Sequence, residues 1–202
     1  MIPRAVHQVW LGPRPVPLRW TEQWRFAGWE YRLWREEDIH LMRPGLANRA
    51  AYDWYLRSGC WHGASDVARV EILLRHGGVF ADADAEPTRP WDAAPFMGLG
   101  FFAAHEVRDD EPGRVANGII GAEAGHPVLA RYAELIGLAP SLEPPWRAVG
   151  GTLLTRAVAE AGDPSAILPE GAFYPVHHTG RLAAPADNWA VQHWATTLGG
   201  YA

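Results

Sequence analysis

The chain has 202 residues, 48% of them hydrophobic, and a formal net charge of −5. This length suits one domain with a full hydrophobic core, and we expect a single domain over residues 1–202. Acidic and basic residues are mixed along the chain without a basic block, which argues against nucleic acid as a partner. All 18 basic residues are arginine, so mechanisms that need a lysine, such as a Schiff base or a P-loop, are excluded.

Cysteine content and hydropathy restrict the class of protein further. Cys60 is the only cysteine, which excludes an internal disulfide and a cysteine metal cluster. The first residues lack a signal-peptide pattern, and no apolar run approaches the roughly 20 residues that span a bilayer. We therefore expect a soluble, cytoplasmic protein without a transmembrane segment; peripheral association with the inner membrane is also compatible with the sequence.

The first half of the chain predicts two strands and two helices. Apolar and β-branched residues indicate a strand over 5–10 and a second short strand over 31–34. A helix is expected over 46–57. Ser65 is a suitable cap for a second helix over 66–76, with apolar residues at helical spacing and two glycines directly after it.

A short apolar strand over 79–81 follows that helix and carries Asp82 and Asp84 at its carboxyl end. Strands alternating with helices predict an α/β domain with a mostly parallel central sheet, in which ligands bind beyond the carboxyl ends of the strands. The remaining predictions are strands over 99–104 and 115–122, helices over 126–136 and 152–161, and extended segments over 167–169 and 173–178.

Asp82 and Asp84 carry the clearest chemical signal. In an extended segment, side chains two residues apart point the same way, so the two carboxylates can converge on one small object. Converging carboxylates without a basic partner repel each other, which favours a bound cation. Oxygen ligands suit Mg²⁺ or Mn²⁺. On this pattern alone, a polar loop that binds nothing is an equally good interpretation.

Asp66 and Arg69 lie three residues apart and therefore share one helix face. Two interpretations stay open. One is a surface ion pair, which contributes little stability. The other is a pair that faces the same cleft as Asp82 and Asp84, where Arg69 holds a phosphate or a sugar hydroxyl.

The stretch 65–87, from Ser65 through Asp82 and Asp84 to Pro87, closely resembles the signature of the DxD sugar-binding glycosyltransferases. This group, glycosyltransferase family 32, includes initiating mannosyltransferases and capsular polysaccharide transferases. The opening residues 2–12 look like the first strand of the group. Further blocks that match in order are 116–121, 125–127, 150–152, 173–175 and 193–194.

The resemblance implies a single-domain, glycosyltransferase-A-type fold and a bound divalent cation, usually Mn²⁺, with Mg²⁺ as the alternative. It implies a nucleoside-diphosphate-sugar donor carrying uracil or guanine, and transfer with retention at the anomeric carbon. The acceptor would be a glycan or a glycosylated molecule. Abundant arginine and alanine without lysine favour a GC-rich bacterial source, so bacterial polysaccharide biosynthesis is the expected context.

Carried over by position, the resemblance assigns a catalytic group and a metal site. Asp66 and Arg69 would contact the donor sugar and its phosphates. Asp82 would reach the ribose or the sugar and assist the metal, and Asp84 would bind the metal directly. His193 would close on the metal and the diphosphate from the C-terminal end.

Two further positions complete the donor site that the resemblance implies. Trp10 would stack on the nucleobase, and Asn117 would lie beside the donor sugar. As interpretations from the residues themselves, a core tryptophan and a turn asparagine stay open at these positions.

Two other functions share parts of this pattern. Phosphatases of the haloacid-dehalogenase type also place a DxD after an apolar strand, but they need a downstream lysine, which this chain lacks. A catalytically degenerate nucleotide-sugar binding protein would keep the same ligand residues. Donor binding without turnover distinguishes that alternative from an enzyme.

Overall fold

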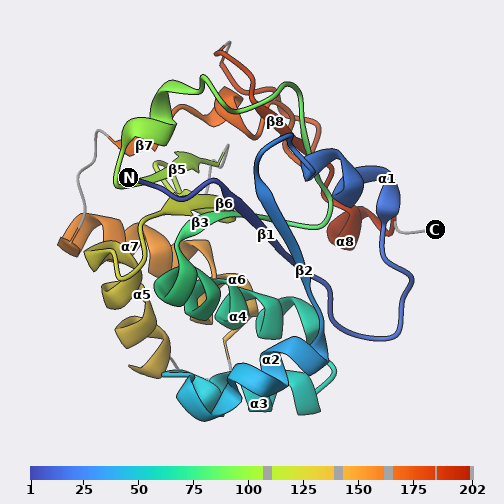
Figure 1. Ribbon diagram of the computed structural model, residues 1–202, viewed down its shortest axis with the longest axis vertical. Helices are drawn as coiled ribbons and strands as arrows, with labels where there is room; N and C mark the ends of the chain where they lie inside the picture. Colours follow the sequence, from blue (N-terminus) through green and yellow to red (C-terminus); the bar gives the residue numbers. More distant parts are fainter. Residues whose placement is uncertain (107–110, 139–142, 162–165, 185, 201–202) are drawn as a thin grey trace.

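The computed structural model describes residues 1–106, 111–138, 143–161, 166–184 and 186–200. A six-stranded sheet in the order β2-β1-β3-β6-β5-β7 runs through the molecule (Figure 1). Its strand β6 is antiparallel to both of its neighbours, and every other pair is parallel. The strands are β1 (Ala5–Val9), β2 (Glu30–Trp34), β3 (Gly78–Ala81), β5 (Phe101–His105), β6 (Val115–Ala122) and β7 (Ile167–Leu168). The predicted α/β architecture with a mostly parallel sheet is confirmed.

A second, two-stranded sheet lies beside the first. It pairs β4 (Ala85–Pro87) with β8 (Ala190–Gln192) in antiparallel register, so Ala85 lies opposite Gln192. Strand β4 begins four residues after β3 ends. This short sheet therefore brings the C-terminal part of the chain directly beside residues 82–84.

The larger helices pack against one face of the main sheet (Figure 1). Strands bury alternate residues in two cores: Phe80 and Phe101 face the helices, whereas Val79 and Phe102 face an aromatic core on the opposite side. The helices are α1 (Leu18–Thr21), α2 (Glu36–Met42), α3 (Arg49–Arg57), α4 (Trp61–His76), α5 (Pro127–Leu138), α6 (Pro145–Ala148), α7 (Gly151–Ala161) and α8 (Ala195–Leu198).

Helix α4 ends at His76 as predicted, but it begins at Trp61, so the predicted cap at Ser65 is wrong. The cause is a tertiary contact. A Cβ atom at Gly63 would lie 2.5 Å from the Tyr55 ring, so the glycine lets the first turn of α4 approach α3 closely. Gly77 ends the helix with a φ of 62°.

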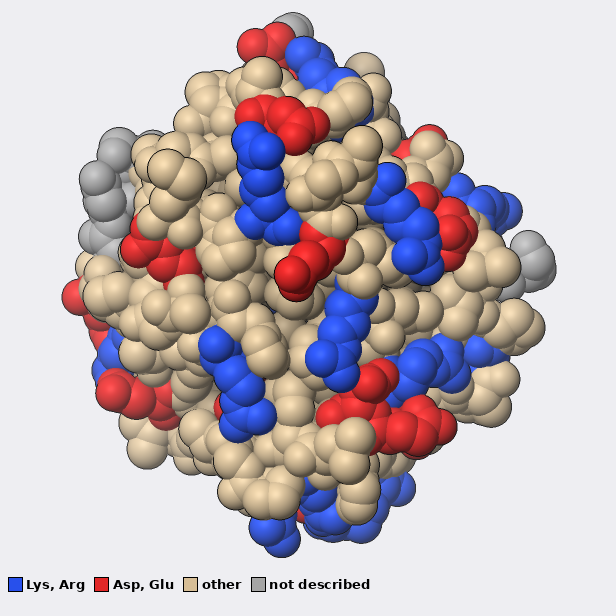
Figure 2. Space-filling view, viewed as in Figure 1, with Lys and Arg blue, Asp and Glu red and all other residues tan. Residues whose placement is uncertain are grey.

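The molecular surface shows no strong charge segregation on the face drawn in Figure 2, where arginine and acidic side chains are interspersed. None of the helices in the described ranges is long and apolar enough to cross a membrane.

Candidate functional site

A cavity of about 880 Å³ opens at the carboxyl ends of β1 and β3. This is the edge of the sheet at which the α/β pattern predicts a ligand. Of the seven site residues predicted from the sequence, six line this cavity, and His193 does not. The six are Trp10, Asp66, Arg69, Asp82, Asp84 and Asn117.

Asp82 and Asp84 both reach the cavity, but not for the predicted reason. The segment 82–84 is a turn rather than an extended strand, and the Ala85 N–H donates to the Asp82 carbonyl at 2.9 Å. The chain must turn here because β3 belongs to the main sheet and β4 to the small one. The alternation argument for this pair is therefore wrong, although its consequence, that both carboxylates line one cavity, is correct.

Arg69 lies at the centre of the cluster. Its Nη2 atom lies 2.8 Å from Asp66 Oδ1 and 3.0 Å from Asp82 Oδ1, and the Arg69 side chain is only 5% exposed. Its Nη1 atom donates to the main-chain carbonyl of Asn117. The surface ion-pair interpretation is therefore wrong, since α4 turns Asp66 and Arg69 toward the cavity that Asp82 also lines.

Asn117 fixes the other side of Asp66. Its Nδ2 atom donates to Asp66 Oδ1 at 2.8 Å and lies 3.5 Å from the Tyr132 hydroxyl. That hydroxyl in turn donates to the Val149 carbonyl at 2.6 Å. Asn117 belongs to β6, so the turn-residue interpretation does not hold. Asp66 is thus held by a guanidinium and an amide in one defined position.

The electrostatics of the cluster favour additional positive charge. Burial raises the pKa of Asp82 to about 7; Arg69 opposes this rise, and the nearby Asp84 and Asp66 carboxylates add to it. Burial also raises the pKa of Asp66 and of Asp84. Arg69 contacts two of these three carboxylates, so a further cation would stabilise their ionised forms.

Asp84 is held by the C-terminal part of the chain. Its Oδ1 atom accepts a hydrogen bond from Gln192 Nε2 and its Oδ2 atom accepts one from the Ala195 N–H, both at 2.7 Å. The His193 N–H donates to the Asp84 carbonyl at 2.9 Å. Each carboxylate oxygen keeps a second lone pair, so Asp84 fits a role as a cation ligand.

The protein's own ligands for such a cation would be few. Among the described residues, no group of three or more histidine, cysteine, aspartate or glutamate side chains is arranged to hold a metal ion. Mg²⁺ commonly binds through one or two carboxylates plus substrate phosphates and water. Asp82 and Asp84 fit that arrangement.

The side chain of His193 is not brought together with this pair. Its Nε2 atom lies 2.9 Å from Glu86 Oε2, and its ring stacks on Trp20 at a centroid distance of 4.8 Å. The neighbouring Trp194 lines the cavity instead. The sequence pattern located this segment beside the site, but it did not identify which of the two side chains faces inward.

Trp10 follows β1 and lies at the other wall of the cavity. Its Nε1 atom donates to the Arg14 carbonyl at 2.8 Å, and its side chain is largely buried. Arg14 and Trp61 also line the cavity. Two indoles and an arginine thus line the same cavity as Asp82 and Asp84.

The cavity continues past Asn117 to residues that the sequence analysis did not select. Tyr174 accepts a hydrogen bond from the Ile119 N–H at 3.0 Å, and beyond it lie Glu106, Arg114 and Trp146. Glu106 and Arg114 are brought together by the antiparallel pairing of β5 with β6, a contact that no local spacing in the sequence reveals.

No family model matches the chain. It is 26% identical over 134 residues to an uncharacterised glycosyltransferase of Acanthamoeba polyphaga mimivirus, covering 63% of this chain and 53% of that protein. It is 28% identical over 137 residues to inositol phosphoceramide mannosyltransferase 3 of Schizosaccharomyces pombe, covering 63% of this chain and 35% of the yeast protein. The chain therefore spans about half the length of the first relative and about a third of the second.

Among solved structures, the PaToxG glycosyltransferase matches with a TM-score of 0.64 at 14% sequence identity, over 79% of this chain and 69% of that one. The resemblance at this identity concerns the fold. Together with the sheet order and the helical layer described above, it shows that this chain has the glycosyltransferase-A-type fold.

Proposed function

We propose that this chain is a metal-dependent glycosyltransferase of the DxD sugar-binding group, family 32. It would move a sugar from a nucleoside-diphosphate-sugar to a hydroxylated acceptor, with retention at the anomeric carbon. The observation that carries the proposal is the convergence of Asp66, Arg69, Asp82 and Asp84 on one cavity at the carboxyl edge of the sheet. The glycosyltransferase relatives support the same reaction class.

The charge distribution supports an anionic donor bound together with a cation. A divalent cation held by Asp82 and Asp84 would supply positive charge to the departing diphosphate. Arg69 presents a buried guanidinium beside the same carboxylates and would stabilise the negative charge that develops there. Arg14 lines the wall toward Trp10, where it would attract the remaining phosphate charge.

The remaining residues would orient the donor. Asp66, fixed by Arg69 and Asn117, would accept hydrogen bonds from sugar hydroxyls. The Trp10 indole would stack on the nucleobase, since its ring borders the cavity at the end of β1. We propose no metal-ligand role for His193, because its ring is engaged by Glu86 and Trp20.

The proposal is tested by incubating the protein with UDP- and GDP-sugars and Mn²⁺ and measuring release of the nucleoside diphosphate. We expect release from one donor, and its loss on adding EDTA. Asp84→Asn should lower the rate at least about 100-fold. Asn is preferable to Ala here because its amide oxygen still accepts one of the two hydrogen bonds that Asp84 receives. Asp187→Asn, at an exposed position, is the matched control.

Two results would contradict the proposal. If no nucleoside diphosphate is released and no nucleotide binds in the presence of Mn²⁺, the cavity is not a nucleotide-sugar donor site. Tight, Mn²⁺-dependent binding without any turnover of any donor would instead identify a degenerate nucleotide-sugar binding protein.

A further inference from the structure

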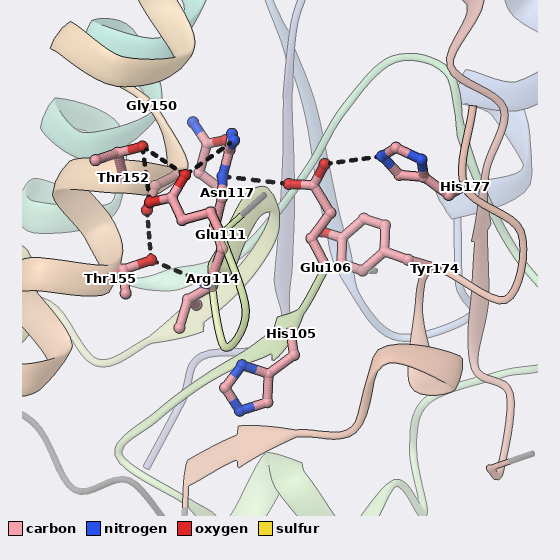
Figure 3. Close-up of polar contacts among 12 residues, drawn as sticks. His105, Glu106, Glu111, Arg114, Asn117, Gly150, Thr152, Thr155, Tyr174 and His177 are labelled. Atoms are coloured by element: carbon pink, nitrogen blue, oxygen red, sulfur yellow. Dashed lines mark hydrogen bonds and ion pairs between the residues drawn. The ribbon is translucent and has the colours of Figure 1, made fainter. Parts of the chain in front are cut away.

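The end of the cavity beyond Asn117 is built around a second buried pair, Glu106 and Arg114 (Figure 3). Glu106 follows β5 and Arg114 precedes β6, and the Glu106 N–H donates to the Arg114 carbonyl at 2.9 Å. Their side chains are 6% and 5% exposed, yet both line the cavity. The chain thus presents a carboxylate and a guanidinium to a space that the donor residues do not fill.

This pair differs in charge from the donor end. Arg114 Nε lies 3.3 Å from Glu106 Oε2, and its Nη1 atom lies 3.7 Å from Glu111 Oε2. With histidines neutral, these three described side chains sum to −1. Two carboxylates thus lie near the one arginine, and an anionic group entering here would meet the net negative charge of these three side chains. Neutral hydroxyls would meet a carboxylate that accepts hydrogen bonds.

The Glu106 carboxylate is flanked on two sides. Figure 3 shows its carboxylate between Arg114 and His177, whose Nε2 atom lies 3.4 Å from Glu106 Oε1. On the far side of Arg114, Thr152 donates to Glu111 Oε1 at 3.2 Å, and Thr155 accepts from the Val115 N–H at 2.8 Å. A preorganised acceptor of this kind loses little entropy when a ligand binds.

Two indoles border the same space. The Arg114 guanidinium lies 4.9 Å from the centre of the Trp146 ring, and the Trp194 ring, which also lines the cavity, lies 5.2 Å from the His177 ring. Trp194 has a φ of 54° and is the only non-glycine residue with a positive φ in the part of the chain that the structure describes. That backbone conformation is unfavourable for a bulky residue, and the neighbouring Asp84 contacts hold it in place.

We propose that this end of the cavity is the acceptor site and that it takes a neutral, polyhydroxylated molecule, a sugar or a polyol. Glu106 accepts a hydrogen bond from an acceptor hydroxyl, and Trp146 and Trp194 pack against the apolar faces of the ring. Because the site would supply the hydroxyl for the transfer proposed above, the inference rests on that function.

The two ends are close enough to serve one reaction. A Cβ atom at Gly118 would lie 2.9 Å from Asp82 Oδ2 and 3.2 Å from the Tyr174 hydroxyl, so Tyr174 lies next to the donor carboxylates. In the transfer step, the acceptor oxygen bonds to the anomeric carbon as the bond between that carbon and the phosphate oxygen breaks. The electron pair of the broken bond leaves with the diphosphate, which also takes the hydroxyl proton.

The test measures binding directly, so that it does not depend on turnover. Methyl α-mannoside, methyl β-glucoside, myo-inositol and mannose 6-phosphate are titrated into the wild-type protein and followed by saturation-transfer-difference NMR. We expect at least one neutral probe to bind with a millimolar Kd, and the phosphorylated sugar to bind at least threefold more weakly. Glu106→Gln and Trp146→Ala should each weaken that binding at least fivefold, and in a donor assay lower the ratio of transfer to hydrolysis.

Matched controls are Glu134→Gln and Trp54→Ala, both exposed and outside the cavity lining. Thermal melting shows whether each variant folds. If Trp146→Ala does not fold, Trp146→Phe replaces it, and the preference of the wild-type protein for neutral over phosphorylated probes tests the inference without any variant. Three results would overturn the inference: preference for the phosphorylated probe, no binding of any neutral probe to the wild-type protein at about 50 mM, or binding that is unchanged in both variants. Binding of a neutral probe without turnover of any donor would contradict the proposed glycosyl transfer, but it would still support a sugar- or polyol-binding site at Glu106.

Discussion

Two buried arginines, Arg69 and Arg114, line one cavity, and each lies near two carboxylates that define the Arg69 end and the Arg114 end. The Arg69 contacts are 2.8 and 3.0 Å, whereas the Arg114 contacts are 3.3 and 3.7 Å. At the Arg69 end, Asp84 is a third carboxylate near Asp66 and Asp82. At the Arg114 end, His177 lies beside Glu106, and the Thr152 hydroxyl donates to Glu111.

The two ends differ in how far the positive charge of the arginine offsets the negative charge of the carboxylates. The described side chains Glu106, Glu111 and Arg114 sum to −1, whereas Asp66, Asp82, Asp84 and Arg69 sum to −2, and the pKa of Asp82 is raised to about 7. An external cation therefore has the larger electrostatic role at the Arg69 end.

The largest effect is expected from Arg69→Met. Removing one partner of a buried ion pair typically costs about 3–5 kcal/mol, because a buried charge is left uncompensated. We expect a loss of this size in urea denaturation, together with a fall in donor turnover of at least about 1,000-fold. Arg114→Met should cost less stability, because its contacts of 3.3 and 3.7 Å with carboxylate oxygens are longer than the 2.8 and 3.0 Å contacts of Arg69. Equal losses of stability from Arg69→Met and Arg114→Met would contradict the inferred difference between the two ends. Arg156→Met, on the surface, is the control.

The free energy of unfolding should depend on pH through the raised pKa of Asp82 at the Arg69 end. The pKa of Asp82 is about 7 in the folded protein and about 3.8 in an ordinary carboxyl, so between these values the folded state binds more protons than the unfolded state. The free energy of unfolding should therefore fall as pH rises from about 4 to 7, relative to Asp82→Asn. Denaturation of both proteins at pH 5 and pH 8 measures this difference.

Added Mn²⁺ is the control for that experiment. It should reduce the loss at pH 8 in the wild-type protein, because it stabilises the ionised carboxylates. A stability difference between wild type and Asp82→Asn that stays constant from pH 5 to pH 8 would contradict the raised pKa.

A smaller effect is expected from Gly118→Ala, at the junction of the two ends. The added methyl group would press on Asp82 Oδ2 and on the Tyr174 hydroxyl. Overpacking of this kind typically costs about 1–3 kcal/mol, and displacing Asp82 should lower donor turnover about tenfold. Gly98→Ala, where the methyl group would meet nothing within 4 Å, is the matched control. Turnover equal in the two variants would show that the position of Asp82 is not critical.

The smallest effect is expected from Glu111→Gln. The partly exposed carboxylate contributes less than about 1 kcal/mol to stability, and the glutamine side chain can still bond Thr152. Thermal melting measures the change. A loss above about 2 kcal/mol would exceed what a partly exposed carboxylate contributes and would contradict the weaker contacts inferred at the Arg114 end.

Part of the Arg69 end was predictable from local pattern. Helical spacing placed Asp66 and Arg69 on one helix face but left a surface ion pair open, and the family resemblance assigned them to the site. The apolar run before Asp82 predicted β3, because that feature is encoded within a few residues. The start of α4 was missed, since it depends on the packing of Gly63 against Tyr55. The turn at 82–84 was missed because the small sheet that requires it pairs β4 with a strand about 100 residues later.

The Arg114 end could not be predicted from local pattern. Glu106 and Arg114 meet only through the β5–β6 register, which shifts between Phe102 and Ala104. An irregularity of this kind changes which side chains face the cavity. The inward-facing side chain at 193–194 was likewise decided by the left-handed backbone of Trp194.

The hydrogen bonds of Asp84 to Gln192 and Ala195 join residues that are 108 and 111 positions apart. Closing a loop of this length costs about 4 kcal/mol in length-dependent chain entropy. During synthesis, residues 82–84 leave the ribosome long before their partners exist. We therefore expect this edge of the sheet to form in two stages, with the contacts of Arg69 first and those of Asp84 only after β8 has paired with β4. A nascent chain would hold Asp82 and Asp84 without the C-terminal residues that bind Asp84.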